Sequence, residues 1–139
     1  MPSPGSSAWN AKKIRTEKVA TSKTINAYET GELYVVSGAA DIVLTLPSAT
    51  AGRYFRVKND PNMMMDLTCS AASSNDTMTG MSVQYLGVNT VSCTTPLGPG
   101  VWKISGSCEA ASVDLEFVSD GTYWHVTCYS TGSNFNFGT

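Results

Sequence analysis

The chain has few charged residues for its length. Asp, Glu, Lys and Arg make up 14% of its 139 residues, whereas an average soluble domain has about 25%. Its net charge is −2 and 42% of its residues are hydrophobic, so it lacks the high charge and low hydrophobicity of a disordered protein. A chain of this length forms one compact domain with a substantial core. Plentiful Ser, Thr, Gly and Asn beside so few charges favour an all-β domain.

Long apolar runs are also missing. No stretch reaches the ~18 consecutive apolar residues that a transmembrane helix needs, so we expect no membrane partner. The first residues, MPSPGSSAWNAKK, lack the apolar core of a signal peptide, so we expect no Sec-type export. No Cys-x-x-Cys pair occurs among Cys69, Cys93, Cys108 and Cys128, which argues against a thiolate zinc site or a redox motif. Three disulfide pairings are open to them, but in a reducing compartment we expect buried free thiols that pack as small apolar residues.

Residues suited to catalysis are scarce. The single histidine, His125, lies within an expected strand, where it is best interpreted as facing solvent or a neighbouring subunit. No G-x-S-x-G motif surrounds a serine, although the members of a Ser-His-Asp triad need only meet in space. Asp114 and Glu116 lie two residues apart, a spacing that solvated strand faces often produce. We therefore expect a protein that is not an enzyme, with no catalytic residues, cofactor or metal.

Basic charge is concentrated at the N-terminus. Residues 1–23 contain five basic residues and one acidic residue, whereas residues 24–139 contain four basic and ten acidic residues. We therefore expect a basic, flexible, extended arm (residues 1–23) on a β-domain (residues 24–139), each part meeting a different partner. Trp9 is suited either to anchor this arm on a partner or to fold back onto its own domain. The β-domain has too few cations for specific nucleic-acid binding, and the arm offers only unspecific phosphate contact.

From Leu33 onward, short alternating segments separated by turn residues indicate seven to nine β-strands. In DIVLTLP, for example, Ile42, Leu44 and Leu46 share one face, and Val43 and Thr45 share the other. This spacing predicts a compact antiparallel β-sandwich or barrel, jelly-roll-like in character. The expected strands lie in the segments ELYVVSG, DIVLTLP, RYFRVKN, DLTCSA, MSVQYLG, VNTVSCTT, VWKIS, VDLEFVS and TYWHVTCYS.

The clearest element is the segment DLEFVSDGTYWHVTCYS, residues 114–130. Leu115, Phe117 and Ser119 share one face of its first half, and Trp124, Val126 and Cys128 share one face of its second half. Asp120-Gly121 supplies the turn, because glycine accepts a positive φ. This segment predicts a β-hairpin whose apolar face fills the core.

Two further segments are suited to contact a partner. Met63, Met64 and Met65 follow a dense turn signal, and three adjacent thioethers cannot all face one core, so we expect at least one to meet a neighbouring surface. The alternative is that they fill space at a loop. The polar tail TGSNFNFGT carries two phenylalanines that we expect to be exposed. The predicted subunit contacts are Met63, Met64, Met65, Phe135 and Phe137.

Three segments together resemble a β-rich module of tailed-phage virion proteins. Residues 35–60, VVSGAADIVLTLPSATAGRYFRVKND, resemble a unit with a strand ending in Leu-Pro, a small-residue turn with Gly and an aromatic-rich strand. SSNDTMTG (73–80) resembles the following D-T-I-x-G loop, and LEFVSDGTYWHV (115–126) resembles the closing L-x-x-D-G-x-x-W-x-V hairpin. The similarity runs from near Thr24 to Tyr129. The chain departs from the pattern in three respects: its middle segment, 81–111, is longer, it has the basic arm, and it lacks a repetitive shaft.

The resemblance implies a virion structural module, usually trimeric, found in head-decoration proteins, tail fibres and spikes. A free-standing module without a shaft fits capsid decoration best. The expected function is therefore that of a cement protein on the capsid surface, which binds the major capsid protein as a symmetric oligomer, a homotrimer. The predicted capsid contacts in the arm are Trp9, Lys12, Lys13, Ile14 and Arg15. The alternative is a tail-fibre or tail-spike module that binds a receptor or glycan, with Tyr123 and Tyr129 stacking on sugars. A small hydrolase with His125 is a third interpretation.

Overall fold

The computed structural model describes residues 15–73, 75–87, 90–94, 100–109, 111–131 and 135–138, and for 86–87 and 90–94 it describes the backbone only. Among the described residues, no helix is long and apolar enough to cross a membrane. These residues form twelve strands, which alternate with short turns. The strands are β1 (Arg15–Val19), β2 (Lys23–Thr24), β3 (Glu32–Val36), β4 (Ile42–Thr45), β5 (Tyr54–Asn59), β6 (Asp66–Ser70), β7 (Met78–Gly87), β8 (Thr90–Thr94), β9 (Lys103–Ser107), β10 (Ser112–Ser119), β11 (Trp124–Thr131) and β12 (Asn136–Gly138).

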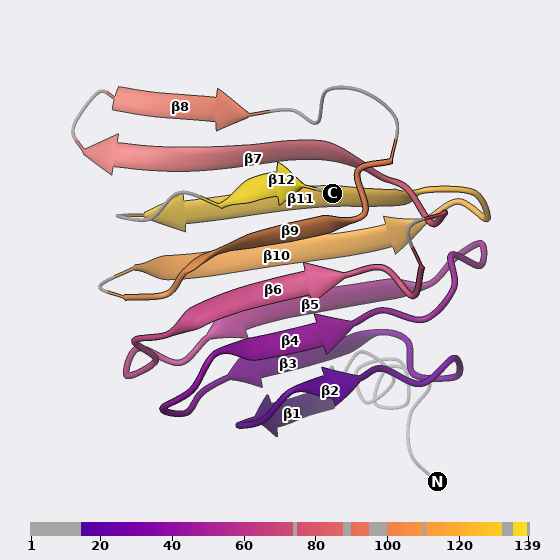
Figure 1. The fold of residues 1–139 in the computed structure, drawn as a ribbon, viewed down its shortest axis with the longest axis horizontal. Helices are drawn as coiled ribbons and strands as arrows, with labels where there is room; N and C mark the ends of the chain where they lie inside the picture. The colour runs from indigo at the N-terminus through magenta and orange to yellow at the C-terminus, as the bar shows by residue number, and fades with distance from the viewer. Residues whose placement is uncertain are drawn as a thin grey trace, which may run out of the picture.

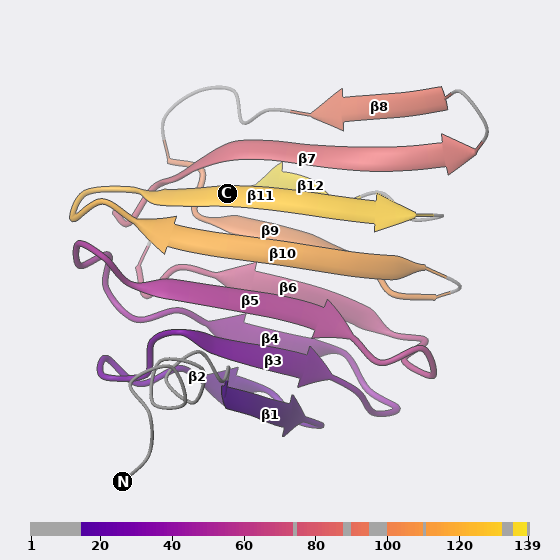
Figure 2. The ribbon, with the colours of Figure 1, turned by 180° about the vertical axis from the view of Figure 1, so that it is seen from behind.

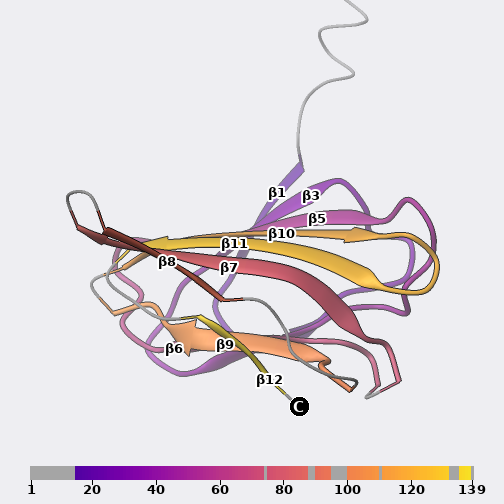
Figure 3. The same cartoon turned by 90° about the horizontal axis from the view of Figure 1, so that it is seen from above.

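The strands form two sheets that pack face to face, which confirms the expected all-β sandwich. The seven-stranded sheet has the order β1-β3-β5-β10-β11-β7-β8, and the five-stranded sheet has the order β12-β9-β6-β4-β2. Figures 1 and 2 show the two sheets from opposite sides, and Figure 3 shows them edge-on as two layers. Each sheet has one face toward the other sheet and one face toward solvent, which is why so many strands alternate apolar and polar residues.

In the first half of the chain, successive strands alternate between the two sheets, so the backbone winds around the core as a superhelical coil. Strands β1, β3 and β5 lie side by side in one sheet, and β2, β4 and β6 lie side by side in the other. Each return to a sheet takes one full turn of the coil, so neighbouring strands run in the same direction. The expectation of an antiparallel sandwich is therefore wrong in this respect, since five of the ten strand pairs in the described residues are parallel.

The predicted hairpin at residues 114–130 is confirmed and occupies the middle of the seven-stranded sheet. Strands β10 and β11 pair antiparallel from Ser112↔Thr131 to Ser119↔Trp124. The turn between them contains Gly121, which has a φ of 100°. On one side β10 pairs antiparallel with β5, and on the other side β11 pairs parallel with β7. The hairpin therefore separates β5 from β7, the next strand along the chain in the same sheet.

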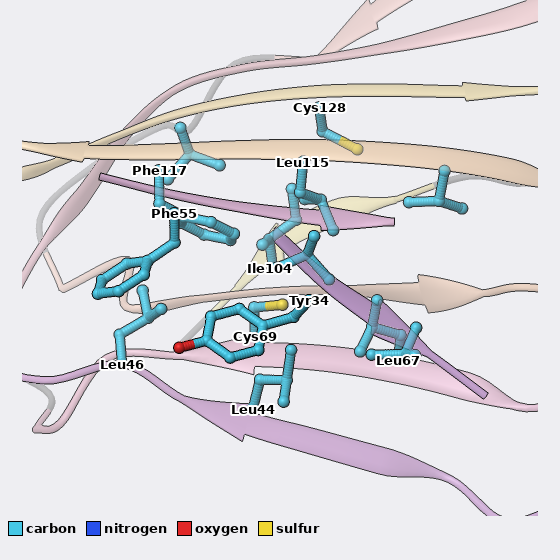
Figure 4. Close-up of a cluster of buried hydrophobic side chains, with 14 of the residues drawn as sticks. Tyr34, Leu44, Leu46, Phe55, Leu67, Cys69, Ile104, Leu115, Phe117 and Cys128 are labelled. Carbon is cyan, nitrogen blue, oxygen red and sulfur yellow. The ribbon is translucent and has the colours of Figure 1, made fainter. Parts of the chain in front are cut away.

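The core lies between the two sheets, where the predicted inward faces meet (Figure 4). Leu115, Phe117, Trp124, Val126 and Cys128 of the hairpin are all buried. Aromatic side chains extend this packing across the strands of the sheet. The ring centroids of Trp124 and Phe55 lie 5.8 Å apart, and those of Phe55 and Tyr34 lie 6.1 Å apart. From the opposite sheet, the buried residues include Ile42, Leu44, Leu46, Leu67 and Ile104.

Cys69, Cys108 and Cys128 are buried free thiols, as expected. Burial raises the pKa of the Cys108 thiol to about 11 and that of Cys128 to about 12, and raises that of Cys69 further. These thiols therefore stay protonated near neutral pH and pack as small apolar groups. The side chain of Cys93 lies outside the described residues.

Strands β7 and β11 approach closely at Gly80, whose φ is 139°. A Cβ atom built on Gly80 would lie 1.8 Å from the backbone oxygen of Val126, its partner in the parallel β11. No side chain fits in that space without displacing a strand. The glycine of the segment TMTG therefore has a structural reason to be a glycine.

Candidate functional site

The outer face of the seven-stranded sheet carries most of the exposed large apolar side chains that the structure describes. Alternation along β7, β10 and β11 turns one set of residues outward, opposite to the buried set. Three lone apolar side chains, Tyr28, Val43 and Met64, are exposed elsewhere. We call the outward set the apolar strip; it comprises Met81, Tyr85, Val118, Tyr123 and Tyr129, which are 36–57% exposed.

The strip has two parts, one on β7 and β11 and one at the turn of the hairpin, and His125 and Thr127 lie between them on the outward face of β11. Thr127 of β11 pairs with Met81 of β7, and the next outward residue of β11, Tyr129, pairs with Val83. Tyr85 pairs with Thr131, so Tyr85 and Tyr129 are diagonal neighbours on one face. At the other end of the hairpin, Val118 pairs with His125. An exposed apolar area of this kind marks a place where a partner binds more often than an isolated apolar residue does.

A groove lies at the Tyr85 end of the strip. It encloses a volume of about 340 Å³, and the side chains that define its character are Tyr85, Tyr129, Val83, Lys58 and Asp114. This volume is at the lower end of the range for small-ligand pockets, about 300–1,000 Å³. A second hollow of about 190 Å³ adjoins it, since Asp114 and Tyr129 line both. Together they form one depression across β5, β10, β11 and β7.

Two cations, Arg56 and Lys58, and two carboxylates, Asp114 and Glu116, form the charged wall of this depression. Arg56 donates a hydrogen bond from Nη2 to Oδ2 of Asp114 at 2.9 Å, and Nζ of Lys58 lies 3.8 Å from the same oxygen. The hydrogen bond to Asp114 raises the pKa of the Arg56 guanidinium. Glu116, the other member of the predicted carboxylate pair, accepts a hydrogen bond from the Tyr54 hydroxyl at 3.4 Å. Both carboxylates are thus engaged by residues of β5.

His125 faces outward, as predicted, and its partner is the turn of the hairpin. Its Nε2 lies 2.7 Å from Oδ2 of Asp120. The backbone N–H of Tyr123, His125 and the backbone N–H of Thr122 together lower the pKa of Asp120 to about 2. In the described part of the chain, Asp120 is the side chain hydrogen-bonded to His125, so this pair holds the turn in shape.

A cluster of carboxylates lies at the opposite edge of the sandwich. Ligand oxygens of Glu17, Glu29 and Glu32 lie within 4.8 Å of one another. The ammonium group of Lys23 lies 3.0 Å from Glu17 and 3.4 Å from Glu29, so the protein supplies its own cation there. The hydroxyl of the buried Tyr34 donates a hydrogen bond to Glu29. This network joins β1, β2 and β3 and serves the fold.

The expected arm is only partly within the described residues. Trp9, Lys12, Lys13 and Ile14 lie outside them. Arg15, the fifth predicted contact, begins β1 and is exposed, with Nη1 lying 3.6 Å from a carboxylate oxygen of Glu32. Residues 15–19 pair in parallel with β3. The expectation of a flexible arm is therefore wrong for residues 15–19, because sheet pairing holds them.

The predicted subunit contacts divide into buried and exposed residues. Met63 and Phe135 are fully buried in the core of their own chain, so the expectation that they meet a neighbour is corrected. A backbone hydrogen bond from Met63 to Asp60 closes a tight turn that carries Met63 into the core, and Phe135 precedes β12, which pairs with β9. Met65 and Phe137 are partly buried against that core. Met64 is exposed and remains a candidate contact.

Sequence reasoning identified part of the apolar strip. Tyr123 and Tyr129 were predicted to be exposed, and both are. Met81 and Tyr85 were missed, because an apolar residue in an alternating segment is normally assigned to the core. Val118 was placed opposite the core face of its strand but was not proposed as a contact. Val118 could have been found from its alternation with the buried Phe117 in the same strand. Met81 and Tyr85 could not, because they share with Val83 the more apolar face of their segment, which alternation assigns to the core. No protein-family model matches the chain, and no curated protein matches it, so similarity to known proteins does not identify what this face binds.

Proposed function

We propose that the protein is a structural protein of a tailed-phage virion that decorates the capsid and stabilises it as a cement protein. In this proposal it binds the major capsid protein in many copies, as a symmetric oligomer with three subunits. The resemblance of residues 35–60, 73–80 and 115–126 to virion modules motivates the class of protein. The apolar strip on the outer face of the seven-stranded sheet is the observation that carries the binding role.

The architecture supports a role in adhesion. The strip lies on a sheet whose other face is packed against the core, so its side chains are presented on a firm surface. A surface that does not rearrange pays less ordering entropy on binding. Tyrosines are favoured at interfaces because they bury a large area and lose few rotamers. Repeated copies on a symmetric shell would add avidity to contacts that are individually weak.

Co-sedimentation with purified phage heads that lack the protein tests this proposal. We expect the protein to pellet with heads, and Tyr129→Ala together with Tyr85→Ala to weaken this association by at least tenfold. Tyr28→Ala is the matched control, since Tyr28 is exposed outside the strip. A chain lacking residues 1–14 tests the arm separately and leaves β1 intact. If the protein does not pellet with heads, the proposal fails.

A tail-fibre or tail-spike role is the second candidate, and one observation favours it. Tyr85 and Tyr129 both line the groove, and aromatic rings beside polar groups suit the stacking of sugar rings. A glycan array, together with electron microscopy that locates the protein on head or tail, separates the two functions. A saccharide bound through Tyr129 on a tail-located protein would replace the cement proposal.

A further inference from the structure

The groove at the end of the apolar strip has a shape and charge that restrict what it can hold. Two tyrosines and Val83 offer apolar contact, and the groove has room for one medium-sized side chain or ring. The apolar surface does not stop at the groove, since Met81, the outward residue before Val83 on β7, continues it along the strand. A site for a small ligand alone has no use for such an extension, whereas a protein interface surrounds its anchoring pocket with further contacts.

The charge of the groove favours an acidic partner. Asp114 accepts its shorter contact, 2.9 Å, from Arg56, and Lys58 is left at 3.8 Å from the same oxygen. The Lys58 side chain is 46% exposed and reaches Asp114 only across this longer contact, so its ammonium group remains accessible at the groove. Glu116, the next carboxylate on β10, lines the adjoining hollow and not the groove. An incoming carboxylate would therefore complete the pairing of Lys58.

We infer that this groove is the anchoring pocket for an apolar side chain that a protein partner presents beside a carboxylate. The inference rests on the proposed function, in that it assigns chemistry to the surface by which the protein docks. The apolar side chain lies between Tyr85 and Tyr129, and the neighbouring carboxylate pairs with Lys58. The partner surface at this point is acidic.

The inference is tested by nuclear magnetic resonance on the full-length ¹⁵N-labelled protein with two probes of the same ring and opposite charge. Phenylacetate carries an aromatic ring and a carboxylate, and benzylamine carries the same ring and an ammonium group. We expect phenylacetate to shift the amide signals of residues 83–85, 112–114 and 129–131, and to bind roughly fivefold more tightly than benzylamine at low salt. Equal affinity for both probes, or no shift at these residues, overturns the inference.

Variants separate the charge from the apolar contact. Lys58→Met should abolish the preference for phenylacetate, and Lys58→Glu should reverse it. Tyr129→Ala should weaken binding of both probes about tenfold, whereas Tyr28→Ala should leave both unchanged. The amide spectrum of each variant shows directly whether it is folded. A retained preference in Lys58→Glu overturns the assignment of Lys58.

The outcome of this binding test can be distinguished from the outcome of the head-association test of the proposed function. Neutral methyl glycosides form a third arm, and a shift of the same amide signals by a glycoside without a shift by phenylacetate overturns the inference in favour of a sugar site. Association with heads that survives Lys58→Glu, with no binding of phenylacetate, sinks the inference and leaves the cement proposal standing. Phenylacetate binding without any association with heads leaves the groove assignment and removes the capsid as its partner.

Discussion

At the scale of single residues, position on the strand decides what each tyrosine does. Tyr34 lies on the inward face of β3, where it is fully buried and donates a hydrogen bond to Glu29. Burial, together with the contact with Glu29, raises the pKa of the Tyr34 hydroxyl. Tyr129 lies on the outward face of β11 and is more than half exposed. The same residue type is thus part of the core in one place and available to a partner in the other.

A core substitution and a surface substitution at adjacent positions should differ sharply. Trp124 is fully buried against Phe55, so Trp124→Ala should lower the free energy of unfolding by about 3–5 kcal/mol. Tyr123, its exposed neighbour, is the matched control, and Tyr123→Ala should change this free energy by less than about 0.5 kcal/mol. Urea unfolding measures both. Similar losses for the two variants would contradict the assignment of faces.

The turn of the hairpin should contribute a pH-dependent part of the stability. The folded pKa of Asp120 is about 2, against an ordinary value of 3.8, because two backbone N–H groups and His125 bind its ionised form. A lowered pKa stabilises the fold above pH 3.8, and this contribution is lost as the pH falls toward 2. Wild type should therefore exceed Asp120→Asn in stability most at pH above about 4, and the difference should shrink toward pH 2. A difference that stays constant over this range would refute the role of Asp120.

At the scale of strands and hairpins, local pattern predicted the elements well and their partners poorly. The segment 114–130 was correctly predicted as a hairpin because its alternation and its Asp-Gly turn are both local signals. The parallel pairing of β3 with β5 depends on how the chain crosses between the layers, which the alternation within either strand does not specify. Phe135 was misplaced for a related reason, since its polar neighbours indicate a surface tail while the pairing of β12 with β9 carries it inward.

The close approach of β7 and β11 gives a prediction at this scale. In Gly80→Ala the new Cβ would fall 1.8 Å from the oxygen of Val126, so the parallel ladder would have to open. We expect a loss of more than ~4 kcal/mol in unfolding free energy, at the extreme for one substitution. Gly52→Ala is the control, because Gly52 also has a positive φ but no atom within 4 Å, and should cost only about 1–2 kcal/mol. Equal costs would contradict the close approach.

At the scale of the whole molecule, two packed sheets shield the reactive groups. Cys69, Cys108 and Cys128 lie inside the sandwich with raised pKa values. We expect these three thiols to resist a disulfide reagent in the native protein and to react once urea unfolds it. Mass spectrometry of the labelled peptides identifies each cysteine. Labelling of any of the three as fast as an unfolded thiol would show that the sandwich opens readily.

The candidate site also belongs to this scale. Tyr129 could be found from strand phase, but the groove needs β5, β10, β11 and β7 side by side, and both β5 and β7 are far in the sequence from the β10–β11 hairpin. The pairing of Asp114 with Arg56 spans 58 residues. The sequence therefore indicated an exposed aromatic surface without its charged wall or its depth.

The insertion of the β10–β11 hairpin between β5 and β7 has a consequence for biosynthesis. The two central strands of the seven-stranded sheet are synthesised after all its other strands. A nascent chain that has emerged only as far as β9 therefore has two unpaired strand edges, on β5 and β7, where the hairpin belongs. Such edges bind other unfinished chains readily. The protein should therefore complete its fold only after β10 and β11 leave the ribosome, and slowly, because the contacts that close the sheet are distant in sequence.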